Sequence, residues 1–142
     1  MSEPTKPITG RCLCGNVTYS VDADPVAQAA CHCEDCQRQS GGPFSVIVGV
    51  PLAALEIQGD SLTKFNTRGV VHGEPTERHF CNRCGAAIYS ISGAMPEVAF
   101  IKVGSLDDAS WVSPAIEVFA GSAQPWSPRF EGATSFERTP AG

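Results

Sequence analysis

The seven cysteines of this chain fall into three short clusters, and their spacing constrains the fold more than any other feature. The clusters are Cys12/Cys14, Cys31/Cys33/Cys36 and Cys81/Cys84. A structural zinc ion takes four protein ligands, whereas a catalytic zinc typically has three and keeps an open position for water or substrate. Because seven cysteines match one site of each kind, the sequence predicts two zinc ions per chain.

Two of the clusters end in the same way, with a glycine directly after the second cysteine. Gly15 follows Cys14 and Gly85 follows Cys84, and glycine permits the positive φ that lets a chain curl around a metal-bound sulfur. These two knuckles can together supply four thiolates. The spacing also permits a ribbon-type site of the C-x₂-C kind, with three cysteines left over. That alternative site would use Cys33, Cys36, Cys81 and Cys84, and spacing alone leaves both groupings open.

Length and composition indicate one domain of mostly β structure. The chain has 142 residues, of which 42% are hydrophobic, enough for one real core. Fourteen glycines and eleven prolines among short apolar runs favour turns and short strands over long helices. We expect a domain over residues 10–137, preceded by a flexible segment, 1–9, and followed by a frayed end, 138–142.

Apolar periodicity predicts the individual elements. Alternation of Val17, Tyr19 and Val21 predicts a strand within residues 10–22, after the first knuckle. Residues 34–39 are expected to form one or two helical turns, which the following Ser-Gly-Gly-Pro segment ends. Residues 67–75 are predicted to be a loop. Further strands are predicted at 27–33, 44–50, 62–66, 77–80, 86–91, 98–103 and 116–119.

Charge and hydropathy narrow the class of partner. The net charge is -5 and there is no basic run, so nucleic acid is not an expected partner. The N-terminal ten residues are polar, and no apolar run approaches the roughly 18 residues that span a bilayer. We therefore expect a cytoplasmic protein without a membrane partner. In a reducing cytosol, closely spaced cysteines are more often metal ligands than disulfides.

Four segments resemble the glutathione-dependent formaldehyde-activating enzyme family, which includes centromere protein V. They are residues 10–17, residues 31–36 with Ser40 and Gly41, residues 80–85 and residues 104–108. The resemblance implies a structural zinc at Cys12, Cys14, Cys81 and Cys84, and a catalytic zinc at Cys31, Cys33 and Cys36. It also implies zinc-pinned antiparallel sheets, sometimes called a β-tent, with short helical turns.

The C-terminal third matches the family less well. Where the family often has His-Ile-aromatic after Pro114, this chain has Glu117-Val118-Phe119, whereas Phe119, Ser122 and Trp126 fit. This difference from the family pattern bears on which residues contact the substrate more than on the fold.

Three thiolates on Zn²⁺ give a site of net charge -1, which is a weaker Lewis acid for making hydroxide than a neutral three-histidine site. Such a site suits capture of an incoming thiol, because a metal-bound sulfur is deprotonated at neutral pH. The resemblance implies a carbon–sulfur lyase that joins glutathione, or a similar thiol, to formaldehyde or a related small aldehyde, as in S-hydroxymethylglutathione synthesis.

A non-catalytic, zinc-stabilised binding module is the alternative function, and redox sensing through disulfides is a third hypothesis. An exposed sheet edge would allow an oligomer.

Other candidates have plain structural interpretations. His32 is expected to point to solvent rather than to shuttle protons, His79 to lie on a strand and His72 on a loop surface. Gln37, Arg38 and Ser40 are expected on a solvated helical turn, although they could meet substrate carboxylates. Trp111, Trp126 and Phe44 are expected in the core rather than in a pocket wall.

Overall fold

Two β-sheets make up the protein in a computed structural model that describes residues 3–68 and 75–140. The smaller sheet has three strands in the order β1 (Ile8–Arg11), β2 (Thr18–Val21) and β5 (Leu55–Gln58), and both pairings are antiparallel. Tyr19 and Val21 on β2 are buried while Thr18 is exposed, so the alternation in the sequence marks the face that packs inward.

The larger sheet has eight strands in the order β11-β10-β3-β4-β9-β8-β7-β6. Its strands are β3 (Ala27–Cys31), β4 (Ser45–Pro51), β6 (Leu62–Thr67), β7 (Thr76–Cys81), β8 (Ala87–Ser92), β9 (Val98–Lys102), β10 (Ile116–Val118) and β11 (Thr134–Ser135). The pairings are antiparallel except at β10, which runs parallel to both β3 and β11.

Helical structure is short. The α-helix α1 (Glu34–Ser40) begins after Cys33, whose sulfur accepts a hydrogen bond from the Cys36 N–H, and ends at Gly41 with φ of 72°. A left-handed residue at this position is a common helix ending, and glycine adopts it without steric cost. In the described part of the chain, the other helical elements are three 3₁₀ turns: η1 (Leu52–Ala54), η2 (Val103–Ser105) and η3 (Ala120–Ser122).

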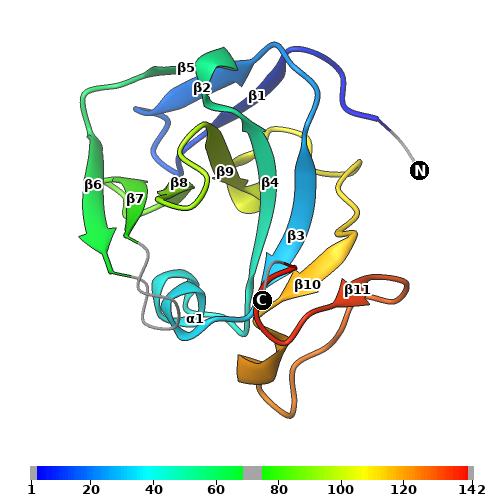
Figure 1. The fold of residues 1–142 in the computed structure, drawn as a ribbon. Coiled ribbons are helices and arrows are strands. Elements are labelled where there is room, and N and C mark those ends of the chain that lie inside the picture. Colours follow the sequence, from blue (N-terminus) through cyan, green and yellow to red (C-terminus); the bar gives the residue numbers. More distant parts are fainter. Residues whose placement is uncertain (1–2, 69–74, 141–142) are drawn as a thin grey trace.

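The core lies where the small sheet packs against the large one. Figure 1 shows the small sheet across one end of the curved large sheet, with α1 near the other end. An isolated antiparallel bridge between Gly10 and Leu106 links β1 to the segment after β9. Buried residues of the core come from both sheets and include Tyr19, Val21, Val48, Ile88 and Ile101. Two cysteines, Cys12 and Cys81, belong to the same cluster.

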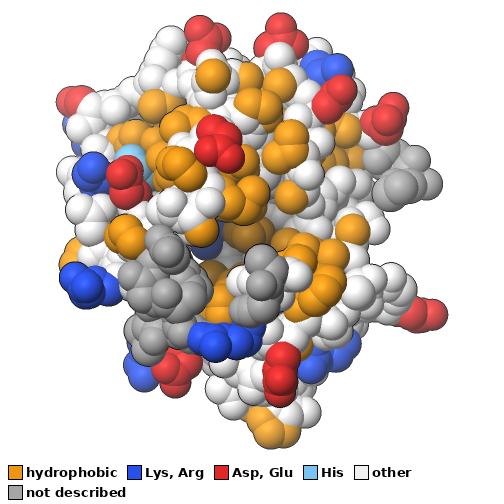
Figure 2. Space-filling model, viewed as in Figure 1, with side chains coloured by type: hydrophobic (Ala, Val, Ile, Leu, Met, Phe, Trp, Pro, Cys, Tyr) orange, Lys and Arg blue, Asp and Glu red, His pale blue; other side chains and the backbone are white. Residues whose placement is uncertain are grey.

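The surface viewed from the same side is mixed in character. In Figure 2, hydrophobic side chains gather around a hollow near the middle of this face, and Lys and Arg side chains lie in small separate groups. No helix among the described residues has the length and apolar character needed to cross a membrane.

The prediction of a mostly β fold with short helical turns is confirmed. Three strands of the structure were not predicted: β5, the two-residue β11, and β1, because a single strand was expected where β1 and β2 lie. Strand β1 begins at Ile8, which is 4% exposed, two residues before the predicted start of the domain. At the other end, the Arg138 carbonyl accepts a hydrogen bond from the Phe119 N–H at 2.7 Å. Most of the predicted 67–75 loop, with His72, lies outside the described residues.

Candidate metal centres

Four cysteines from the two sheets meet in one cluster. Their sulfurs, from Cys12, Cys14, Cys81 and Cys84, lie within 4.8 Å of one another. The Cys14 sulfur lies 3.6 Å from that of Cys12 and 3.8 Å from that of Cys81. Four sulfurs about 2.3 Å from a zinc ion at the centre of a tetrahedron are about 3.8 Å apart, so this donor set fits zinc.

Local backbone structure explains why both knuckles face the same point. Gly15 has φ of 84° and Gly85 has φ of 78°, a conformation that glycine adopts readily. The Val17 N–H donates to the Cys12 sulfur at 3.3 Å, and the Arg83 N–H donates to the Cys81 sulfur at 3.4 Å. Both knuckles therefore turn amide groups toward their sulfurs, as the glycine positions predicted.

A serine in the turn directly before β6 supports the same cluster. The Ser61 hydroxyl lies 3.1 Å from the Cys81 sulfur, and Ser61 is itself tied to the Asn16 side chain. This hydrogen bond is the main cause that lowers the pKa of Cys81 to about 6, which favours the thiolate form that a metal requires. Sequence reasoning missed Ser61, because its contact with Cys81 depends on how β6 pairs with β7.

The remaining three cysteines form a second cluster around the start of α1. The sulfurs of Cys31, Cys33 and Cys36 lie within 4.8 Å of one another. Cys31 ends β3, Cys33 caps α1 and Cys36 lies in its first turn. Cys31 and Cys36 are buried, whereas Cys33 is partly exposed. The arrangement provides three soft donors to a single ion and leaves the fourth position for another ligand.

The structure decides between the two groupings of the cysteines that their spacing left open. The structure joins Cys81 and Cys84 to Cys12 and Cys14, and it places Cys33 and Cys36 with Cys31. The ribbon-type grouping of Cys33 and Cys36 with Cys81 and Cys84 is not formed in the described part of the chain, which contains all seven cysteines.

Two cations from the large sheet act on the three-cysteine cluster. The pKa of Cys36 lies well below its usual value, because the Cys31 and Cys33 thiols hydrogen-bond to its sulfur and the charges of Lys102 and Arg78 favour the thiolate. Arg78 is 8% exposed. Sequence reasoning missed both residues. For Lys102 the available signal was a basic residue at the end of the apolar strand β9, whereas Arg78 lies among polar residues of β7 and had no such signal.

His32 lies inside the protein, so the expectation that it points to solvent is wrong. It is fully buried, and its Nε2 lies 2.7 Å from a carboxylate oxygen of Glu117. Strand β10 runs parallel beside β3 and pairs Glu117 with Ala30, which brings the carboxylate to the histidine. Nδ1 of His32 has no hydrogen-bond partner among the described residues. Glu117, part of the segment that departs from the family pattern, is thus a partner for the histidine between two clustered cysteines.

Glu117 is held as a carboxylate by its neighbours. Burial alone would raise its pKa, but hydrogen bonds from His32, the Phe130 N–H and Arg129 outweigh burial and lower it. Arg129 Nη1 lies 3.3 Å from the Glu117 carboxylate, and the Phe130 N–H donates to the other oxygen at 3.2 Å. The C-terminal segment is therefore fastened to the strand beside the three-cysteine cluster.

Replacing Glu117 with alanine should lower the free energy of unfolding by about 2–3 kcal/mol, because it leaves a buried histidine and an amide without their acceptor. Urea unfolding of the metal-loaded protein, followed by circular dichroism, measures this. Glu131→Ala is the matched control, since Glu131 is exposed in the same C-terminal segment and should change stability by less than about 0.5 kcal/mol. Equal effects of the two variants would contradict a role for the buried pair.

The remaining predicted candidates have structural roles or lie at the surface. Gln37 donates to the carbonyls of His32 and Ser122 at 2.7 and 3.1 Å, so it fixes the helix rather than facing solvent. Arg38 is exposed and lines a cleft of about 810 Å³ with Trp126.

Trp111 is in the core as predicted, whereas Trp126 is 70% exposed. His79 lies on β7, as predicted, and stacks on Tyr89. Ser40 accepts from the Gly42 N–H at the end of α1, and Phe44 packs edge-on against His32.

Comparisons with known proteins agree with this geometry. The family model described as glutathione-dependent formaldehyde-activating enzyme matches residues 7–122. Two curated relatives, each named "Putative glutathione-dependent formaldehyde-activating enzyme", are 27% identical to this chain. The Halomonas elongata protein aligns with 70% of this chain and 66% of its own length. The Penicillium rubens protein aligns with 79% and 60%. The chain thus spans about three fifths to two thirds of the length of these relatives.

A solved structure supports the fold. The crystal structure of a Rhodobacter sphaeroides protein superposes with a TM-score of 0.57 at 23% identity, over 70% of this chain and 87% of that one. At this identity the match concerns the fold alone. The family model, in contrast, covers most of the chain and all three cysteine clusters. This chain belongs to the glutathione-dependent formaldehyde-activating enzyme family.

Proposed function

We propose that the protein is a zinc-dependent carbon–sulfur lyase that joins glutathione, or a similar small thiol, to formaldehyde or a related aldehyde. The observation that carries the proposal is the cluster of Cys31, Cys33 and Cys36, whose three sulfurs gather around one point and include one partly exposed member. Family membership supports the choice of thiol and aldehyde.

The two cysteine clusters have separate roles in this proposal. Cys12, Cys14, Cys81 and Cys84 hold a structural zinc, and Cys31, Cys33 and Cys36 hold a catalytic one. A zinc ion bound by three thiolates supplies an open coordination position at which a thiol sulfur is held as the thiolate. In the reaction the thiol proton is released, the sulfur forms a bond to the aldehyde carbon, and the carbonyl oxygen takes up a proton.

The chain's own residues position this chemistry. The ladder between β3 and β4 fixes Cys31, and the N-terminus of α1 fixes Cys33 and Cys36. Gln37 ties the helix to the carbonyl of His32, and the His32–Glu117 pair anchors the chain between Cys31 and Cys33. Because the addition of a thiol to formaldehyde also proceeds without an enzyme, proximity and thiolate activation are the contributions required of the protein.

The test combines metal content with catalysis at equilibrium. We expect elemental analysis to find two zinc ions per chain. Magnetisation-exchange NMR of glutathione with ¹³C-formaldehyde should show faster interconversion with S-hydroxymethylglutathione when the protein is added. Protein stripped of the more labile zinc should lose this acceleration and regain it when zinc is restored. Two tightly held zinc ions without any acceleration would contradict the enzyme and favour a non-catalytic binding module.

A further inference from the structure

Lys102 is a partly buried cation whose charge is not matched by a carboxylate. It is the last residue of β9, and its Nζ donates to the Ser45 hydroxyl at 3.0 Å. None of the ion pairs found among residues 3–68 and 75–140 includes Lys102. An ammonium group has three donors, so the contact with Ser45 leaves others available to a ligand. Because a buried charge is costly when unpaired, a counter-charge is expected nearby.

The three-cysteine cluster lies at the end of β4 toward which the Lys102 ammonium extends. Ser45, which holds the Lys102 ammonium, is 6% exposed and lies directly opposite Cys31 in the ladder between β3 and β4. Lys102 itself pairs with Ile47 on the other edge of β4. The ammonium therefore reaches along β4 toward the end of the strand where Cys31 lies.

Arg78 is the second cation near the cluster, but its charge is already matched. Its guanidinium hydrogen-bonds Gln39 at 3.0 Å and Thr67 at 3.3 Å, and lies 3.9 Å from the Asp35 carboxylate. Gln39 and Asp35 both belong to α1, so Arg78 fastens the helix to β7. Of these two cations, Lys102 is therefore the one that no carboxylate among the described residues pairs with, and its charge can compensate added negative charge.

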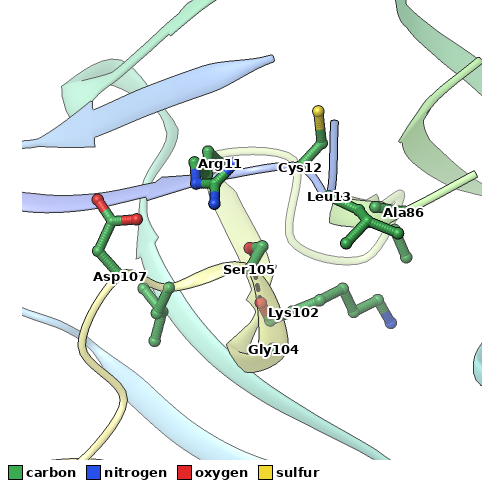
Figure 3. A pocket seen from close by; sticks show the side chains of 10 residues that line it. Arg11, Cys12, Leu13, Ala86, Lys102, Gly104, Ser105 and Asp107 are labelled. Atoms are coloured by element: carbon green, nitrogen blue, oxygen red, sulfur yellow. Dashed lines mark hydrogen bonds between the residues drawn. The ribbon is translucent and has the colours of Figure 1, made fainter. Parts of the chain in front are cut away.

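Lys102 can also be reached by a ligand. It lines two neighbouring clefts of about 510 and 400 Å³, which share Ala86, Ala87, Lys102 and Gly104. A side-chain carbon built on Gly104 would meet no atom within 4 Å, so the shared region is open. Figure 3 shows the Lys102 side chain extended beneath Leu13 and Ala86, with its nitrogen directed away from Arg11 and Asp107.

We propose that Lys102 is the counter-charge for a thiolate substrate at the Cys31/Cys33/Cys36 site, so that this site prefers anionic sulfur ligands to neutral ligands. The inference rests on the proposed function and deepens it. Three thiolates and one Zn²⁺ carry a net charge of -1, and a fourth thiolate brings it to -2. A lysine charge held by Ser45 offsets this increase, which a neutral ligand would not cause. Lys102 acts here as a positioning residue through its charge.

Direct binding to the zinc-loaded protein tests this. Calorimetric titrations would compare glutathione, 2-mercaptoethanol and imidazole, of which the last is a neutral zinc ligand. Lys102→Met should lower the affinity for both thiols by about tenfold or more, as expected for one lost charge at short range. The affinity for imidazole should change by less than about twofold. Lys102→Arg should restore most of the thiol affinity. Lys64→Met, which removes a half-exposed lysine on β6, should leave all three ligands unchanged.

Several results would overturn the inference. Equal weakening of imidazole and the thiols would show that Lys102 only maintains the fold of the site. Weaker binding of glutathione alone would show that Lys102 binds a carboxylate of glutathione, because 2-mercaptoethanol has none.

If Lys102→Met loses zinc or fails to fold, Lys102→Gln repeats the test with a donor to Ser45 retained. Wild-type protein that binds thiols, beside variants that bind them equally well, would refute this inference and leave the proposed function standing. Wild-type protein that binds no thiol would refute both.

Discussion

Replacing Cys12 with serine should lower the free energy of unfolding by about 5 kcal/mol or more, which is much of the stability of an ordinary domain. Cys12 is 2% exposed and belongs to the main core cluster together with Cys81. Cys12 follows β1 of the small sheet, whereas Cys81 ends β7 of the large sheet. The proposed structural zinc therefore clips the two sheets together, and loss of one ligand removes binding energy that counts as folding energy.

Thermal unfolding and zinc content measure this effect together. The Cys12→Ser protein should hold at most one zinc ion per chain and should unfold at a much lower temperature than wild type, if it folds at all. Leu13→Ser is the matched control in the same knuckle, because Leu13 is 79% exposed and a surface change should cost less than about 0.5 kcal/mol. A Cys12→Ser protein that keeps two zinc ions and melts like wild type would refute the structural role.

The sequence predicted the cysteine clusters better than it predicted their neighbours. Glycines at positions 15 and 85 indicated two knuckles of the same kind, and both glycines adopt positive φ. Spacing could not decide which knuckles meet, because that depends on which strands lie side by side. The resemblance to a family supplied the grouping that the structure shows.

The same limit explains the residues that were missed. Glu117 reaches His32 through a parallel pairing of β10 with β3. Lys102 on β9 reaches Ser45 on the neighbouring strand β4. The two residues in each contact are 85 and 57 positions apart in the sequence, respectively, so no local pattern encodes them. A charged residue in the apolar strand β9 was the available signal for Lys102, which acts on Cys36. Arg78, which also acts on Cys36, lies in the largely polar strand β7 and had no such signal. Strand β5 was missed because its four residues alternate too briefly between partly buried and exposed.

Replacing Cys36 with serine should have the opposite pattern of effects to the change at Cys12. We expect the rate acceleration of S-hydroxymethylglutathione formation to fall more than about 100-fold, because even residues that only support a metal ligand contribute 10- to 100-fold. The free energy of unfolding should fall by only about 1–2 kcal/mol. Cys36 packs in a small cluster with Cys31 and Phe119, apart from the main core, so its loss leaves the contact between the sheets intact.

Zinc content, exchange rate and urea unfolding measured on one preparation of Cys36→Ser distinguish these effects. One zinc ion should remain per chain, with the circular dichroism spectrum of wild type and no acceleration of the exchange. Glu34→Ala, at an exposed position on the same helix, should keep two zinc ions and the wild-type rate. If Cys36→Ser and Cys12→Ser lose stability equally, the two clusters share one structural role, and the division into structural and catalytic zinc is wrong. If Cys36→Ser instead keeps its activity, the thiol is activated elsewhere, because a serine hydroxyl is a far weaker zinc ligand than a cysteine thiolate.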